Sequence, residues 1–419
     1  MILLHGIASR HDLPLPLWLV VTAAAVVLIV TFWVALFAWR TPRYREEKGV
    51  ELPRLTRVVD SRGAGLALAA AGVLVWGLSA AALWFGVDRI DNPAVGFVYV
   101  WLWVGLVPAA LLFGQVHRRT NAVRALLWFR GATAPAHDEP RGSLVPAAGA
   151  LAVFSFLELV QPGGSTVPVL RWYAAAWFAW LVVGELVGRG WIARADPFEA
   201  YASTVARLSP WARSPRGLLM WTHPLRNLAA WQAPRGLAVL ASVLLGGTLF
   251  DALSNTALWV RATQDMGPEK TAVGAVALLA CMAAVLGLFR LGTLSYRGVR
   301  MDALAPGLVP LVAGYALAHY GTMLYLEGQR TLFRFSDPLG RGWNLFGLIE
   351  AAPDTMLLAY PTLIAVTQVL LIVGGHALGV LVTHDIALRT APSGALVHLP
   401  LLAVMVAFTV GGLLLMFGG

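Results

Sequence analysis

Long apolar segments separated by short polar ones run along the whole chain. Each is close to the roughly 20 apolar residues that a helix needs to cross a bilayer. We therefore predict an all-α, polytopic membrane bundle that forms a single domain over residues 1–419. The ten predicted spans are Leu17–Ala38, Ala64–Gly86, Gly96–Gln115, Ser143–Val160, Thr166–Gly188, Leu237–Leu258, Thr271–Phe289, Ala303–Leu326, Met356–Val382 and Val397–Phe417, of which the fourth and tenth are the least regular.

The composition agrees with this pattern. The chain is 58% hydrophobic and only 13% charged, whereas soluble domains are about 45–50% apolar. Its one cysteine, Cys281, excludes an internal disulfide and any multi-cysteine metal or iron–sulfur site. The Walker A, Gly-x-Ser-x-Gly, His-Glu-x-x-His and dinucleotide-binding motifs are absent, so the sequence does not support those soluble chemistries.

Lysine and arginine are distributed unequally between the two sets of loops. Of the 31 such residues, 23 follow the odd-numbered spans and 8 lie in the opposite loops and the N-terminal tail. Membrane proteins keep basic loops in the cytoplasm. The pattern predicts that the odd-numbered loops are cytoplasmic and that both termini are extracytoplasmic.

Two connections are unusually long. In the cytoplasmic loop 189–236, Asp196-Pro197 is typical of a helix start. Trp211, Trp221 and Trp231 alternate there with arginines, a mixture that favours the anionic inner leaflet over nucleic acid. The extracytoplasmic loop 327–355 is rich in turn-forming residues, and we expect it to fold back over the outer mouth of the bundle.

The strongest functional signal is Asp251, an acid within an apolar span. Burying a carboxylate there costs roughly 2.5–3.5 kcal/mol, so such residues are functional candidates. Two alternatives stay open: a purely stabilising pair with a neighbouring helix, or a shorter helix that leaves Asp251 at the water boundary.

Two further ionisable groups fall at a similar depth. At a rise of 1.5 Å per residue, Asp251, His319 and Glu158 lie roughly 21, 24 and 22 Å from the inner boundary. With His5 and His11 of the tail, they are suitable ligands for a zinc-like divalent metal, or suitable groups for proton transfer. Alternatively, Glu158 marks a helix end at the headgroups and His319 is a satisfied interhelical donor.

A second polar set lies nearer the inner side. Its members are Glu185, Gln368, His376, His384 and Asp385. Histidine and acid chains of this kind form proton or ion paths in transporters. The alternative is that His384-Asp385 ends the ninth span at the inner surface.

Several motifs carry a resemblance to a known family. They are His5-Gly6-Ile7 with Asp12-Leu13-Pro14, Asn92-Pro93 leading into Val98 to Leu106, Asp196-Pro197-Phe198-Glu199, Phe250-Asp251 with Ser254, Asp337-Pro338 with Gly340 to Asn344, and His376 with His384-Asp385. They resemble bacterial membrane proteins often labelled fenitrothion hydrolase. Where that family has Asn-Pro-Trp-Arg, this chain has Asn121-Ala122-Val123-Arg124.

The resemblance implies hydrolysis of lipophilic organophosphorus-type esters. We expect Asp251, His319 and Glu158 to form an outward-facing pocket in which a metal-bound hydroxide attacks, while Arg341 steadies the developing negative charge. Two other functions fit the polar groups and the basic loop: a proton- or ion-coupled transporter, and a non-catalytic subunit that binds partners in a membrane complex.

Overall fold

The computed structural model describes residues 16–44, 48–128, 142–390 and 395–417. Within these ranges, eight helical segments are long and apolar enough to cross a membrane. They are α1 (Leu17–Ala38), α3 (Arg62–Phe85), the continuous α4–η2–α5 (Pro93–Gly96, Phe97–Gly105 and Leu106–Phe113), α9 (Val167–Val187), α13 (Leu237–Ser254), α15 (Glu269–Thr293), the continuous α16–η4–α17 (Met301–Leu304, Ala305–Leu308 and Val309–Arg334) and α18 (Pro361–Thr390).

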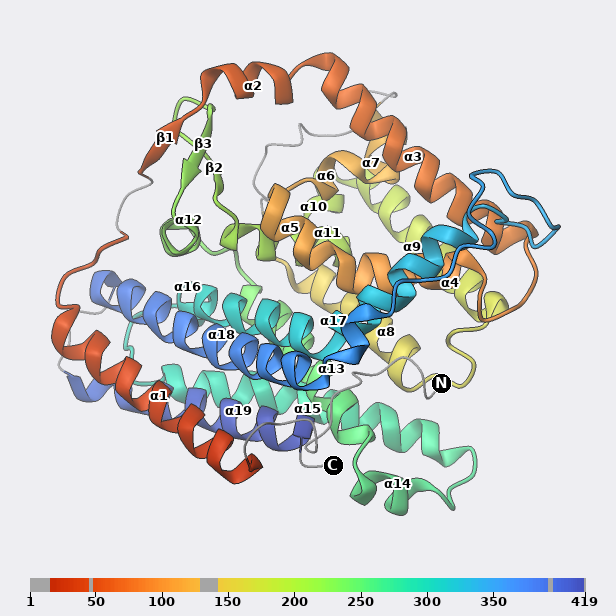
Figure 1. Cartoon of the computed structure of the whole chain (residues 1–419). Helices are drawn as coiled ribbons and strands as arrows, with labels where there is room; N and C mark the ends of the chain where they lie inside the picture. The colour runs from red at the N-terminus through yellow and green to blue at the C-terminus, as the bar shows by residue number, and fades with distance from the viewer. Residues whose placement is uncertain (1–15, 45–47, 129–141, 391–394, 418–419) are drawn as a thin grey trace.

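Two further apolar helices are shorter. They are α8 (Val145–Leu159) and α19 (Leu399–Phe417), and they coincide with the two least regular predicted spans. The prediction of a helical membrane protein is confirmed, whereas the number of ten spans stays a prediction. In Figure 1, α18 lies between α1 and α17, and α19 packs against α1, α18 and α15.

Short elements connect these helices. The short helices are α2 (Pro53–Val59), α6 (His117–Thr120), α7 (Ala122–Trp128), α10 (Trp191–Ala195), α11 (Pro197–Val205), η3 (Ala206–Leu208), α12 (Pro224–Ala230), α14 (Ala257–Thr263), η5 (Met356–Ala359) and η6 (Ala395–His398). Helix α17 continues to Arg334, so the loop expected over residues 327–355 begins eight residues later than predicted.

The fold is not purely helical. Strands β1 (Gly49–Glu51), β2 (Trp211–Arg213) and β3 (Leu219–Thr222) form an antiparallel sheet in the order β1-β3-β2. Trp221 pairs with both Val50 and Trp211. Strands of three or four residues are too short to show an alternating pattern, which explains why the sequence did not reveal them. We call this end of the molecule, at the upper left of Figure 1, the sheet end.

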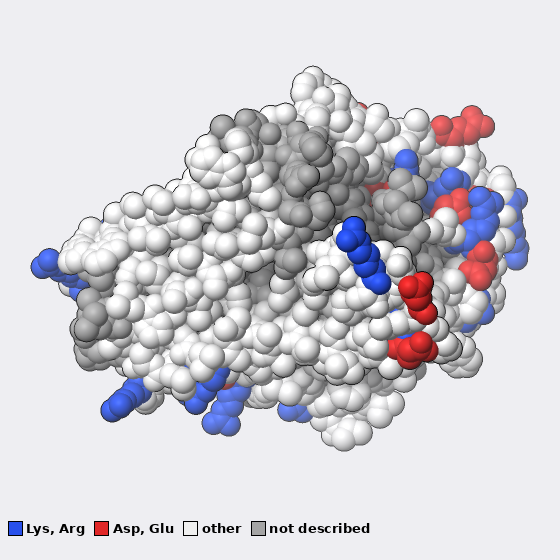
Figure 2. All heavy atoms as spheres, turned by 90° about the horizontal axis from the view of Figure 1, so that it is seen from below, with Lys and Arg blue, Asp and Glu red and all other residues white. Residues whose placement is uncertain are grey.

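The surface of the bundle is apolar where lipid contacts it. Large side chains such as Leu74, Val187, Leu279 and Leu370 are more than half exposed. Figure 2 shows a face whose broad middle carries almost no charged atoms, with Lys and Arg at its left end and lower edge. A soluble protein rarely leaves such a large apolar area uncovered, so this surface contacts the bilayer.

Part of the long 189–236 segment is buried in the bundle. The sequence placed this segment at the membrane surface, but Phe198 and Tyr201 of α11 are at most 1% exposed. Their rings pack against Phe154 of α8 and Trp103 of η2. Asp196 caps α11 by accepting hydrogen bonds from the backbone N–H groups of Phe198 and Glu199. Here α11 is a short internal helix, whereas Arg189, Trp221 and Gln232 of the same segment are exposed.

Helix α4–η2–α5 contains nine residues of π-helix, from Phe97 to Gly105. Such segments are rare and often occur at functional sites. The indole of Trp101 donates to the carbonyl of Gly328, and the hydroxyl of Tyr99 donates to the carbonyl of Gly164. The π-helix thereby fixes Trp103 next to α11 and α17.

Candidate functional site

Asp251 lies in the last turn of α13 and is 1% exposed. The helix ends at Ser254 rather than at Leu258, because Thr256 caps a new helix, α14, by accepting from the backbone N–H of Trp259. Gly246 lets α13 approach α15 closely, since a Cβ there would lie 2.4 Å from the Cα of Met282. This tight packing holds Asp251 inside the bundle and not at a water boundary.

The Asp251 carboxylate joins two residues of α17. Its Oδ2 accepts a 2.7 Å hydrogen bond from the Tyr320 hydroxyl and pairs with Nε2 of His319 at 2.9 Å. Asn255 Nδ2 contacts Oδ1 at 3.3 Å. An ionised carboxylate can only accept, so Nε2 carries a proton, and whenever the imidazole is neutral Nδ1 keeps its lone pair. Among the described residues, Nδ1 is buried without a hydrogen-bond partner.

Aromatic rings hold His319 in place from two sides. The Tyr315 ring stacks on the imidazole with centroids 5.7 Å apart, and Tyr320 meets it edge-on at 4.6 Å. Trp103 of the π-helix lies 6.2 Å from Tyr320. The Tyr315 hydroxyl is buried and has no hydrogen-bond partner. The orientation of the His319 ring is therefore fixed, while His319 Nδ1 and the Tyr315 hydroxyl can still bind a ligand or a water molecule.

Glu158 approaches from α8. The residue is partly exposed, but its Oε2 is buried without a hydrogen-bond partner. Helix α8 packs against α13, the helix that carries Asp251. The structure thus brings Asp251 and His319 into contact, as their common depth predicted, and places Glu158 on a neighbouring helix. We call these three residues, with Tyr315 and Tyr320, the Asp251 cluster.

Arg341 is not part of the Asp251 cluster. It is exposed in the loop after α17, where its backbone N–H donates to Asp337 and its guanidinium lies over Trp343. The expected role in steadying negative charge has no geometric support. His5 and His11 lie outside the described residues.

Within the described ranges, no group of three or more His, Cys, Asp or Glu side chains is placed to hold a metal ion. Zinc sites take at least three protein ligands. In the Asp251 cluster, the carboxylate and imidazole bind each other. Because His5 and His11 lie outside the described residues, the expected zinc-like site stays a prediction.

Comparison with known proteins assigns no chemistry to the Asp251 cluster. No protein-family model, curated protein or solved structure matches this chain. The resemblance drawn from short motifs stays a prediction.

The second predicted polar set is dispersed and mostly structural. Gln368 donates to the carbonyl of Ala318, and His376 Nδ1 bonds to the carbonyl of Ile372. Glu185 accepts from the backbone N–H groups of Gly190 and Ile192. The Gln368 bond ties α18 to α17 and the Glu185 bonds tie α9 to the turn that follows it, whereas the His376 bond lies within α18.

His384 and Asp385 do not end α18, which continues to Thr390. Asp385 accepts from the Trp39 indole and the Arg43 backbone N–H, and His384 Nε2 bonds to the carbonyl of Trp39. The pair therefore fastens the segment after α1 to α18.

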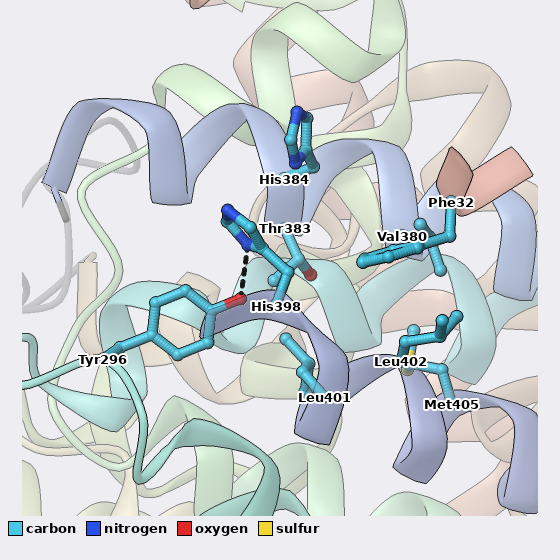
Figure 3. A pocket seen from close by; sticks show the side chains of 9 residues that line it. All are labelled: Phe32, Tyr296, Val380, Thr383, His384, His398, Leu401, Leu402 and Met405. Carbon is cyan, nitrogen blue, oxygen red and sulfur yellow. Dashed lines mark hydrogen bonds between the residues drawn. The ribbon is translucent and has the colours of Figure 1, made fainter. Parts of the chain in front are cut away.

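Beside His384 lies a small cavity of about 20 Å³, room for a single water. Figure 3 shows His398 pointing toward Tyr296, whose hydroxyl lies 2.8 Å from Nδ1 of His398. His398, near the start of the predicted tenth span, was not among the candidate residues predicted from the sequence.

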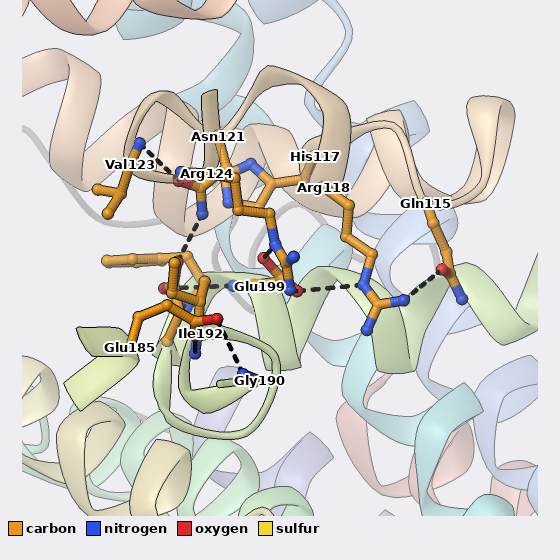
Figure 4. A network of polar contacts seen from close by, with 12 residues as sticks. Gln115, His117, Arg118, Asn121, Val123, Arg124, Glu185, Gly190, Ile192 and Glu199 are labelled. Carbon is orange, nitrogen blue, oxygen red and sulfur yellow. Dashed lines mark hydrogen bonds and ion pairs between the residues drawn. The ribbon is translucent and has the colours of Figure 1, made fainter. Parts of the chain in front are cut away.

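A second buried ionic network joins α6, α7 and α11 and was not predicted from the sequence. Figure 4 shows Glu199 of α11 facing two guanidinium groups. Arg124 binds both carboxylate oxygens at 2.6 Å, and Arg118 Nε lies 3.1 Å from Oε1. Asn121 donates to Asp196 at 2.8 Å. We call Arg118, Arg124, Asn121, Asp196 and Glu199 the Glu199 network.

The environment of this network shifts its ionisation. Burial raises the pKa of Asp196 to about 7, reinforced by the charge of Glu199. Burial lowers the pKa of the neighbouring His117 to about 4. For Glu199, burial alone would raise the pKa, but Arg124 and Arg118 outweigh it and lower the value. Asn121 and Arg124 thus both take part in this network.

Proposed function

We propose that the protein is a membrane-embedded hydrolase of lipophilic esters, including organophosphorus-type esters. The observation that supports this function is the Asp251–His319 pair with its buried, unpartnered Nδ1. An imidazole oriented by a carboxylate, with one nitrogen free, is the arrangement of a general base.

In this mechanism, a water molecule bound at Nδ1 of His319 attacks the phosphorus or carbonyl carbon of the ester. The water proton passes to Nδ1 as the new P–O or C–O bond forms. Asp251 stabilises the resulting imidazolium, and the bond to the leaving alcohol breaks as that proton is returned to it. Tyr320 holds the carboxylate through its 2.7 Å hydrogen bond. Glu158 is a second candidate for protonating the leaving group.

Hydrolysis of aryl carboxyl esters and aryl phosphotriesters by the purified protein tests this mechanism. His319→Gln removes the base and Asp251→Asn removes its charged partner, so each lowers kcat by about 10²- to 10⁴-fold. Asp354→Asn, an exposed carboxylate outside the cluster, is the matched control and keeps wild-type activity. Full activity in both cluster variants would exclude the mechanism.

The proposed mechanism uses no metal ion, and the zinc-like ion stays a separate prediction. Elemental analysis of the purified full-length protein tests it directly. Stoichiometric metal, together with loss of activity on chelation, would replace the metal-free mechanism by one that includes the N-terminal histidines.

The proposed topology has ten spans, with both termini outside a bacterial cytoplasmic membrane. The support is the unequal distribution of Lys and Arg together with eight long and two shorter apolar helices. Accessibility of single cysteines placed in successive loops, in a Cys281→Ser background, tests each crossing.

A proton-coupled transporter is the alternative that one observation favours. His319, His376 and His384 are all buried and lie at successive levels along α17 and α18, as in proton paths. Substrate uptake driven by a pH gradient in proteoliposomes, without hydrolysis of the substrate, would favour this alternative over the hydrolase.

A further inference from the structure

An apolar cavity of about 230 Å³ lies among α13, α15, α17, α18 and α19. Its lining is apolar apart from Thr248, Tyr315 and His376, and it includes no Asp, Glu, Lys or Arg. An engineered apolar cavity of about 150 Å³ holds benzene. This cavity therefore has room for a substituted aromatic ring or a molecule of similar size.

The cavity lies one helical turn from the Asp251 cluster. Thr248 is three residues before Asp251 on α13, and Tyr315 is four residues before His319 on α17, which places each pair on one helix face. Tyr315 belongs to both places, because it lines the cavity and stacks on His319. A ligand in the cavity would contact the ring that orients the imidazole.

One side of the cavity is formed by residues that the protein leaves exposed. Ala284 and Leu288 of α15 and Ala407 of α19 line it and are exposed. Both helices carry apolar, lipid-contacting surfaces, as the exposure of Leu279 and Leu414 shows. Between α15 and α19 the cavity therefore borders the bilayer and not a water-filled vestibule.

The polar groups of the lining restrict the ligand. A charged ligand would be costly to bury here, because no Asp, Glu, Lys or Arg lines the cavity to pair with it. The ligand is therefore neutral. The Tyr315 hydroxyl is buried and lacks a partner, and it can donate one hydrogen bond. A carbonyl or phosphoryl oxygen is the matching acceptor.

We propose that this cavity binds a neutral, mainly apolar small molecule that enters sideways from the bilayer and accepts a hydrogen bond from Tyr315. The identification of this ligand with the substrate rests on the hydrolase proposed above. The binding itself does not depend on hydrolysis.

Gly411 provides a way to fill the cavity. It lines the cavity, and a Cβ at this position would meet nothing within 4 Å. Gly287 of α15 is equally unobstructed, is exposed and does not line the cavity. Gly411→Leu and Gly287→Leu are therefore the same chemical change inside and outside the proposed site.

Binding is measured by ¹⁹F NMR on the full-length protein in lipid nanodiscs, with empty nanodiscs to subtract partitioning. The probes are methyl 4-fluorobenzoate, which carries an acceptor, and 1-ethyl-4-fluorobenzene, which lacks a carbonyl. Both probes bind saturably to the wild type and to Gly287→Leu. Gly411→Leu abolishes saturable binding of both. Equal binding by the two glycine variants would overturn the proposal.

Tyr315→Phe tests the hydrogen bond. It weakens binding of the ester about two- to tenfold and leaves binding of the hydrocarbon unchanged. An equal effect on both probes, or none on either, would exclude Tyr315 as the donor.

His319→Gln separates this inference from the hydrolase. It removes turnover but keeps saturable probe binding. Probe binding by a wild type that hydrolyses no ester would refute the hydrolase and leave the binding site intact. Hydrolysis without saturable binding of either probe would refute the binding site alone.

Discussion

The Asp251 cluster and the Glu199 network are both buried and ionisable, but their polar atoms are used differently. In the Glu199 network, each carboxylate oxygen of Glu199 meets a guanidinium. In the Asp251 cluster, Asp251 binds His319 and Tyr320, whereas His319 Nδ1, Tyr315 Oη and Glu158 Oε2 lack hydrogen-bond partners among the described residues. Buried polar groups are normally satisfied. The comparison suggests that the first region stabilises the fold and the second is kept ready for a ligand or a proton.

The largest effect should come from breaking the ionic network. Glu199→Gln leaves the buried guanidinium groups of Arg118 and Arg124 without their counter-ion, and such a loss destabilises by about 3–5 kcal/mol. Denaturant unfolding in detergent measures the change. Glu51→Gln, which removes an exposed pair with Arg216 at 3.5 Å, should change stability by less than about 1 kcal/mol. Equal effects of the two variants would contradict the structural role.

His319→Gln should lower activity strongly and stability only weakly, the reverse of Glu199→Gln. A loss of at least 100-fold in kcat corresponds to about 2.7 kcal/mol of transition-state stabilisation. Its unfolding free energy should change by much less than that of Glu199→Gln, because the glutamine amide can still donate to Asp251 in place of Nε2 and Nδ1 has no partner to lose. Parallel measurement of activity and unfolding on the same preparation decides the comparison. A variant that unfolds as readily as Glu199→Gln would make His319 a structural residue.

The two tyrosines sharpen the contrast within the cluster. Tyr320→Phe removes a hydrogen bond to a carboxylate, which is worth about 1.5–3 kcal/mol. Tyr315→Phe removes a hydroxyl without a partner and should change the unfolding free energy by less than about 0.5 kcal/mol. The difference between their unfolding midpoints checks this, and a larger loss for Tyr315→Phe would show that its hydroxyl is engaged in the folded protein.

The sequence predicted the helical membrane class and the convergence of Asp251 and His319, because both follow from one-dimensional rules: apolar length and helical rise. It missed the sheet, whose strands are too short to be periodic. It also missed the Glu199 network, because Arg118, Arg124 and Glu199 come from segments 75 or more residues apart and read as ordinary loop charges. The position of Arg341 depended on loop packing, which residue spacing does not determine.

In the wild type, the smallest expected effect is the pH dependence of the Glu199 network, because two contributions of opposite sign nearly cancel. The folded-state pKa of Asp196 is raised from 3.8 to about 7, so its contribution to stability is complete below pH 4 and is lost as pH rises through 7. The folded-state pKa of His117 is lowered from 6.5 to about 4, so its contribution is complete above pH 6.5 and is lost as pH falls through 4.

Between about pH 4 and 6.5 these two contributions have opposite signs and largely cancel in the wild type. Relative to the wild type, Asp196→Asn should lose stability as pH falls, because only His117 then titrates. His117→Gln should gain stability as pH falls, because only Asp196 does. Each slope is at most about 1.4 kcal/mol per pH unit for one proton. Unfolding of the three proteins across this range tests the signs. Parallel pH profiles would show that neither group titrates differently in the folded and unfolded chain, and the Glu199 network would then be a set of fixed charges.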